Sequence, residues 1–157
     1  MGKIRVGDKV PDVTLISSSD KKVTLKDYID KKNIVLYFYP KDNTPGCTKE
    51  ACAFRDNYED FKEMGAEVIG VSSDSLETHQ EFVKKHSFPF LLLSDEEKKV
   101  RKRFSVPSTL GLIVGRVTYI IDKKGVVRHI FSSQFKPTKH IAKALDALKK
   151  LENKQAA

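Results

Sequence analysis

The chain contains two cysteines, Cys47 and Cys52, and four histidines, which are the residues best suited to redox or metal chemistry. Two cysteines in 157 residues are too few for the disulfide framework of a small secreted protein. A structural zinc site takes four ligands, and the histidines lack the paired spacing of such a site. We therefore expect the cysteines to serve chemistry other than zinc binding.

Cys47 has the sequence surroundings of a reactive nucleophile. It follows a predicted strand and the turn residues Pro45 and Gly46, which places it in the first turn of a predicted helix. Unpaired backbone N–H groups and the helix dipole favour the thiolate there, and the thiolate is the attacking form. The alternative is a small buried hydrophobe in the apolar stripe of the helix, the usual place of a lone cysteine. Position and the second cysteine favour the nucleophile.

Cys52 lies five residues further along the same predicted helix. Five helical steps rotate it about 140° from Cys47, off the apolar stripe, so we expect it to face outward. An intact helix holds the two Cα atoms about 8.6 Å apart, beyond the roughly 7 Å that a disulfide can bridge. A disulfide between them therefore requires the helix to open. The spacing also differs from the Cys-x-x-Cys of thioredoxin-like reductases, which favours a peroxidase over a reductase.

Around the cysteines, strands and helices alternate. Residues 13–16 and 22–25 predict an N-terminal β-hairpin, and the β-branched and aromatic run 33–39 predicts a buried central strand. Apolar residues at steps of three and four predict a helix from Cys47 to about Met64.

The second half of the chain continues this alternation. Strands are expected at 67–72 and 89–93, helices at 75–86 and 96–104, and a closing hairpin at 117–122 and 126–131. A last helix begins near Pro137 and frays from about residue 150. The pattern predicts one α/β domain over 1–157, with a parallel sheet covered by helices.

The segment from Tyr37 to Cys52 resembles the active-site segment of peroxiredoxins of the Q, or bacterioferritin-comigratory, subfamily. Pro40, Thr44 and Cys47 match the family pattern Pro-x-x-x-Thr-x-x-Cys. The likeness continues in order through 10–12, 66–72, 93–95 and 115–122, so it covers nearly the whole chain. It implies a thioredoxin-like fold, with a central mixed β-sheet flanked by helices and an N-terminal β-hairpin.

The resemblance also implies roles for residues around Cys47. Pro40 shields the pocket, Thr44 supplies a hydroxyl donor, and Arg116, which opens a late strand, stands over the thiolate. A fixed guanidinium favours the anion and orients the peroxide. The alternative for Arg116 is a surface salt bridge.

Two further charged residues near Cys47 leave their roles open. Glu50 either holds Arg116 or is a solvated glutamate of the first helical turns. Arg55 is interpreted as a charge on the helix surface.

As an activity, the resemblance implies reduction of hydrogen peroxide and organic hydroperoxides without metal, haem or flavin. A sulfenic acid formed on Cys47 condenses with Cys52, and a dithiol protein such as thioredoxin reduces the resulting disulfide. A monomer is expected, in the bacterial cytoplasm or, for a mature plant or algal form, in a plastid. A redox-sensing interaction protein and a disulfide reductase remain as alternative classes.

The composition limits the partners. The formal charge is +8, but the lysines come singly or in pairs, which favours a solvated surface over a nucleic-acid face. The densest basic stretch, 98–103, fits an acidic partner or the wet side of a short helix. The apolar segment 106–115 is interpreted as core or loop cover, with docking as the alternative. The sequence lacks both a secretory-type apolar start and a run long enough to cross a membrane.

Overall fold

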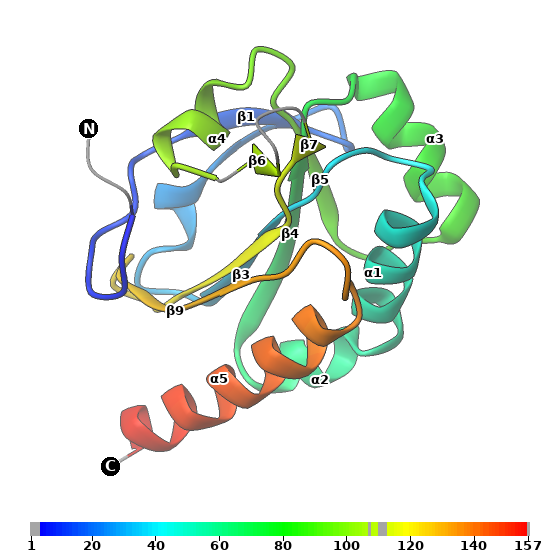
Figure 1. Ribbon diagram of the computed structural model, residues 1–157. Helices are drawn as coiled ribbons and strands as arrows, with labels where there is room; N and C mark the ends of the chain where they lie inside the picture. The colour runs from blue at the N-terminus through cyan, green and yellow to red at the C-terminus, as the bar shows by residue number, and fades with distance from the viewer. Residues whose placement is uncertain (1–3, 107, 110–112, 157) are drawn as a thin grey trace.

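A seven-stranded mixed sheet forms the centre of the protein (Figure 1), in the strand order β2-β1-β5-β4-β3-β8-β9. The computed structural model describes residues 4–106, 108–109 and 113–156. β3 and β4 pair in parallel, as do β4 and β5, and the other neighbours are antiparallel. The strands of this sheet are β1 (Thr14–Ser17), β2 (Lys22–Thr24), β3 (Asn33–Phe38), β4 (Ala66–Ser72), β5 (Leu91–Ser94), β8 (Val117–Ile121) and β9 (Val127–Ser132).

Helices cover both faces of the sheet (Figure 1). One face carries α1 (Pro45–Asp56), α2 (Tyr58–Glu63), α3 (Leu76–His86) and α5 (Lys139–Ala156), and the other carries α4 (Lys99–Arg103) and the 3-10 turn η1 (Leu25–Tyr28). β3 shows why two cores form. Val35 and Tyr37 belong to one buried cluster, whereas Ile34, Leu36 and Phe38 belong to the other, because successive strand residues point to opposite faces. The predicted hairpins and central strand are confirmed.

Two helix boundaries differ from the predicted ones. The helix expected over 47–64 is divided at Asn57, whose side chain donates to the Ala53 carbonyl at 2.8 Å and competes with the helical backbone. The helix expected from Glu96 begins only at Lys99. The Asp95 carboxylate accepts from the backbone N–H groups of Val100 and Arg101, at 3.2 and 3.0 Å, and so sets the later start.

The last helix also has boundaries that differ from the predicted ones. α5 begins at Lys139 and continues to Ala156, past the point where the sequence predicts fraying. Within the apolar segment 106–115, β6 (Ser108–Thr109) pairs with β7 (Ile113–Val114). Residues 107 and 110–112 lie outside the described residues, so the packing interpretation of this segment stays a prediction.

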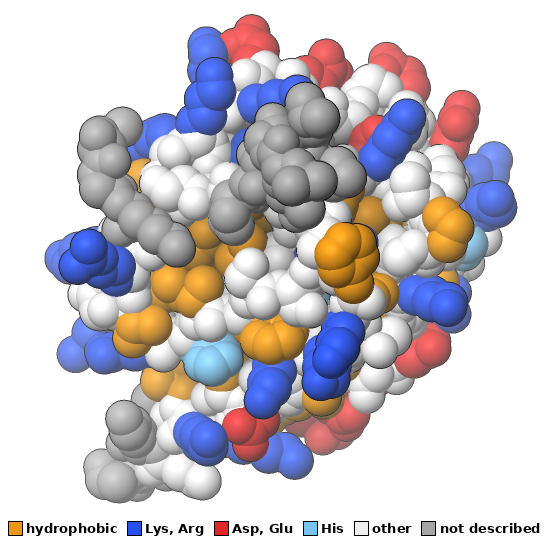
Figure 2. Space-filling model, in the orientation of Figure 1, with side chains coloured by type: hydrophobic (Ala, Val, Ile, Leu, Met, Phe, Trp, Pro, Cys, Tyr) orange, Lys and Arg blue, Asp and Glu red, His pale blue; other side chains and the backbone are white. Residues whose placement is uncertain are grey.

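The surface charge is mixed. On the face in Figure 2, Lys and Arg side chains are interspersed with acidic ones over the described residues. In the described part of the chain, no helix has the length and apolar character needed to cross a membrane.

Candidate active site

Cys47 is the third residue of α1 and is 1% exposed. Because the helix begins at Pro45, which has no N–H, the backbone N–H groups of Gly46 and Cys47 have no helical carbonyl partner. Thr44 does not cap them, since its hydroxyl donates to the Lys41 carbonyl at 2.8 Å. Two backbone donors are therefore available to an anion at the Cys47 sulfur.

Arg116 lies directly before β8, and its guanidinium lies beside the start of α1. The side chain is 5% exposed, and Nη1 donates to Glu50 Oε1 at 2.7 Å. A Cβ added to Gly46 would sit 3.1 Å from an Arg116 Nη atom, so the glycine leaves room for the guanidinium beside Cys47. Burial alone would lower the pKa of Arg116, but the charges of Glu50 and Cys47 and hydrogen bonds to both raise that pKa above its ordinary value.

Glu50 is fully buried, which settles its location in favour of holding Arg116 rather than facing solvent. Burial raises the pKa of Glu50 to about 8, although Arg116 acts in the opposite direction. Its second oxygen, Oε2, faces His140 Nδ1 at 3.7 Å and has no hydrogen-bond partner among the described residues. The carboxyl group is therefore held in place by one strong bond, to Arg116.

His140, from α5, is the buried side chain next to the free oxygen of Glu50. Its Nε2 donates to the Ser133 carbonyl at 2.9 Å, and its Nδ1 is 2.7 Å from the Thr118 hydroxyl. Burial, with a smaller contribution from the Arg116 charge, lowers the pKa of His140 to about 4. A neutral ring accepting from the Thr118 hydroxyl fits both contacts.

Cys52 lies in the same helix as Cys47, and both thiols are free. The expected outward orientation is wrong: Cys52 is half-buried against the helix-side core, because the end of α3 covers this side of α1. Arg55 is also more than a surface charge, since its Nη1 donates to the His86 carbonyl at 2.8 Å. Pro40 is half-buried and lies two residues after the end of β3.

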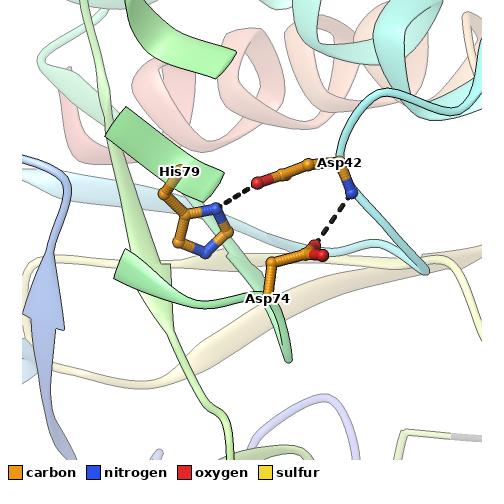
Figure 3. A group of neighbouring side chains, drawn as sticks. All are labelled: Asp42, Asp74 and His79. Atoms are coloured by element: carbon orange, nitrogen blue, oxygen red, sulfur yellow. Dashed lines mark hydrogen bonds and ion pairs between the residues drawn. The ribbon is translucent and has the colours of Figure 1, made fainter. Parts of the chain in front are cut away.

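A buried polar network holds the loop before Cys47 (Figure 3). Asp42 Oδ2 lies 2.5 Å from His79 Nδ1, Asp42 Oδ1 accepts from the Tyr39 hydroxyl at 2.6 Å, and the Asp42 N–H donates to Asp74 Oδ2 at 2.8 Å. His79 Nε2 lies 2.9 Å from the Leu93 carbonyl, which can only accept, so Nε2 carries a hydrogen. Asp74 also accepts from the Ser72 hydroxyl.

Among the described residues, one group has side-chain ligand atoms close enough together to hold a metal ion. It consists of Asp42, Asp74 and His79, whose ligand atoms lie within 4.8 Å of one another. Each of these side chains is already engaged in the hydrogen bonds of the network, and both nitrogens of the His79 ring are used. These three side chains therefore fit the role of holding the loop in place through hydrogen bonds.

Of the predicted site residues Cys47, Cys52, Thr44, Pro40 and Arg116, the structure brings Arg116 beside Cys47. The sequence predicts no role for Asp42, His79, His86 or His140. One signal was available for Asp42 and Asp74: both follow parallel neighbouring strands, whose carboxyl ends meet at one edge of the sheet.

Comparison with known proteins extends these observations. Residues 6–130 match the AhpC/TSA family. "Peroxiredoxin Q, chloroplastic" of Triticum aestivum is 52% identical over 151 residues, which are 96% of this chain and 69% of the relative. The protein of the same name in Arabidopsis thaliana is 53% identical over 148 residues, 94% of this chain and 68% of the relative.

Solved structures give the same result. Peroxidoxin BcpB of Mycobacterium tuberculosis superposes with a TM-score of 0.87 at 36% identity, covering 94% of this chain and 97% of that one. A PrxQ mutant of Xylella fastidiosa superposes with a TM-score of 0.87 at 32% identity, covering 96% and 98%.

Proposed function

The chain belongs to the AhpC/TSA family, and within it to the Q-type peroxiredoxins, and from this premise we propose that Cys47 is its peroxidatic and Cys52 its resolving cysteine. Proteins of this kind are thiol-dependent peroxidases, and the chain is such an enzyme. The observation that carries the residue assignment is the position of Cys47. It is buried in the first turn of α1, beside free backbone N–H groups and the Arg116 guanidinium.

In the first step, the Cys47 thiolate attacks one peroxide oxygen and the O–O bond breaks. The sulfur becomes a sulfenic acid, and the leaving oxygen departs as water or alcohol after taking a proton. Arg116 and the N–H groups of Gly46 and Cys47 stabilise negative charge at the sulfur and on the separating oxygens. Glu50 keeps the guanidinium in place through its 2.7 Å bond. Thr44 and Pro40 lie at the rim of the peroxide pocket. Thr44 can donate a hydrogen bond to the peroxide once its hydroxyl turns away from the Lys41 carbonyl.

In the second step, the Cys52 thiolate attacks the Cys47 sulfenic sulfur, and a disulfide and water form. Cys47 and Cys52 share one helix, whose intact geometry keeps them too far apart, so α1 must open for this bond. A dithiol reductant then attacks the disulfide and restores both thiols.

We further propose thioredoxin as that reductant and a monomer as the working form. The relatives with plant sources are named chloroplastic, and the two solved structures described above come from bacteria. A plastid or the bacterial cytoplasm is therefore the proposed compartment. Light scattering at micromolar protein concentration tests the monomer.

The deciding experiment follows NADPH oxidation with thioredoxin, thioredoxin reductase and either hydrogen peroxide or cumene hydroperoxide. We expect sustained turnover that requires both thioredoxin and peroxide, and one intramolecular disulfide by mass spectrometry. Oxidation of the thiols without turnover would instead support a redox sensor. Reduction of insulin without peroxide consumption would support a disulfide reductase.

A further inference from the structure

Cys52 contacts a histidine at the end of the neighbouring helix. Its Sγ lies 3.8 Å from Nδ1 of His86, the last residue of α3, which is within hydrogen-bonding reach for sulfur. Both side chains are half-buried. The resolving thiol therefore has a potential proton acceptor in the closed form of the enzyme.

The position of His86 is built by several contacts. Its ring stacks on Phe88, with centroids 5.4 Å apart and planes at 20°, and meets the Phe82 ring edge-on at 5.2 Å. Arg55 donates to the His86 carbonyl at 2.8 Å, so the residue is also tied to α1, three positions after Cys52. The aromatic contacts set the plane of the His86 ring, and the Arg55 bond keeps the residue beside α1.

The charges around His86 favour its neutral form. Burial, followed by the positive charges of Lys85 and Arg55, lowers the pKa of His86 below its ordinary value. Lys85 and Arg55 are the charged groups that act on His86, Cys52 is in hydrogen-bonding reach of it, and Asp56 pairs with Arg55 at 3.0 Å. With its hydrogen on Nε2, a neutral ring offers the Nδ1 lone pair to the Cys52 S–H.

We propose that His86 is the general base of the resolving step, which rests on the assignment of Cys47 and Cys52 above. Nδ1 takes the Cys52 proton, and the thiolate attacks the Cys47 sulfenic sulfur. The S–S bond forms as the S–O bond breaks, so the Cys52 sulfur is oxidised and the Cys47 sulfur is reduced. The departing hydroxide takes up a proton from the imidazolium through solvent and leaves as water. No other oxidant or reductant is needed.

The arrangement places the proton transfer before the opening of α1. While the helix is closed, Cys52 touches His86 and cannot reach Cys47. An imidazolium beside Lys85 and Arg55 is disfavoured, so it returns its proton readily once the thiolate leaves.

The test measures disulfide formation in a single turnover. Reduced protein is mixed with one equivalent of hydrogen peroxide, quenched at set times, and assayed by mass spectrometry for sulfenic acid, trapped with dimedone, and for disulfide. His86→Phe keeps an aromatic ring for the contacts with Phe82 and Phe88. His86→Gln keeps a hydrogen-bonding side chain that does not titrate, and His129→Gln serves as the matched control on β9. The rate of sulfenic acid formation is measured in the same samples, so that a slower reaction of Cys47 with peroxide is distinguished from slower disulfide formation.

We expect the wild-type rate of disulfide formation to rise with pH through an inflection below about 6.5, where His86 becomes neutral. Both His86 variants should form the disulfide at least about tenfold more slowly at pH 7 and lose this inflection. The His129→Gln protein should match the wild type.

A wild-type rate and pH profile in both His86 variants would overturn the proposal. A slower rate with an unchanged inflection would also overturn it, because it would leave His86 with a packing role alone. If the wild type itself forms no disulfide, the assignment of Cys52 fails, and that result is distinct from a failure of His86.

Discussion

The loop before Cys47 and the helix that carries both cysteines are held in different ways. In the loop, residues 39–44, Asp42 is 3% exposed and is bonded to Tyr39, to His79 of α3 and to Asp74 after β4. In α1, four side chains are buried, and among them Phe54 is the one large apolar group. We call these regions the anchor loop and the cysteine helix.

The ion pairs of the cysteine helix become more exposed toward its end. Near its start, Glu50 is bound to the buried Arg116, whereas near its end the Arg55–Asp56 pair has side chains 34% and 65% exposed. Exposed pairs contribute about 0–1 kcal/mol, and breaking a buried pair costs several times more. The comparison teaches that this enzyme separates two demands. The anchor loop preserves the position of the peroxide site, and the proposed disulfide requires the cysteine helix to open.

Cys47→Ser should have the largest effect, because it removes the reacting atom at the start of the cysteine helix. A hydroxyl is a far weaker nucleophile than a thiolate, so peroxide consumption should fall at least about 1000-fold. Thioredoxin-coupled NADPH oxidation measures it, and denaturation curves check that the fold is retained. More than a few per cent of residual turnover would mean that the chemistry lies elsewhere.

Cys52→Ser should stop the cycle while sparing the anchor loop. The first oxidation of Cys47 should proceed, and the sulfenic acid should accumulate and react with dimedone, because its partner thiol is gone. Cycling with thioredoxin should fall at least about tenfold. Normal cycling in this variant would move resolution to the reductant itself and would remove the need for the helix to open.

Arg116→Ala tests the bond that connects the cysteine helix to β8. Losing the guanidinium should slow the reactions of Cys47 with peroxide and with iodoacetamide, by about 100-fold for peroxide, since one stabilising donor is lost. Adding Glu50→Gln removes the carboxyl left without its partner and separates chemistry from folding. Arg128→Ala, which removes a half-exposed arginine paired with the buried Asp122, is the matched control. Equal rates for Arg116→Ala and this control would return Arg116 to the role of an ordinary salt bridge.

Asp42→Asn weakens the anchor loop without touching a cysteine. Unfolding in urea should become easier by about 1–3 kcal/mol, because a charged, buried hydrogen-bond acceptor is replaced by a neutral one. The same substitution at Asp56, on the exposed end of the cysteine helix, should change stability by less than about 0.5 kcal/mol. Equal losses at the two positions would contradict the difference between the regions.

These two regions also differ in how far the sequence reveals them. The cysteine helix can be predicted from the sequence because a helix start, a nucleophile and a second cysteine lie within a few positions of one another. The strand before it is also predictable, since it has a continuous apolar run. Arg116 could be assigned through the family resemblance, since nothing in its neighbours along the chain marks it as buried.

The anchor loop and His86 could not be found in that way. Asp42 and His79 are 37 residues apart, and Cys52 and His86 are 34 apart, so each contact depends on how α3 packs against the sheet and α1. Local periodicity predicts that α3 exists, but it does not set the rotation or the depth of the helix. The sequence does not predict the helix break at Asn57 for a related reason. The break is caused by one side chain, which competes with the backbone for the Ala53 carbonyl.

The last prediction compares the two regions directly, by hydrogen exchange in the reduced and oxidised protein. Amides from about Cys47 to Arg55 should exchange faster in the oxidised form, because five helical steps exceed the reach of a disulfide and the helix must open to form it. The amide of Asp42, bonded to Asp74 at 2.8 Å, and those of Ile34 to Phe38 in the centre of the sheet should stay protected in both forms. The Cys52→Ser protein treated with peroxide is the control, since it is oxidised at Cys47 without forming the disulfide.

Three results are possible, and each tells something different about the two regions. Faster exchange confined to Cys47 through Arg55, and absent from the Cys52→Ser control, would establish that the disulfide itself opens the helix. If the Asp42 amide also loses protection, the anchor loop moves with the helix, and the peroxide site must be rebuilt in every cycle. Equal protection of both redox forms over Cys47 to Arg55 would mean that the two cysteines do not pair within one chain, because both lie in α1 and cannot be joined while it is intact.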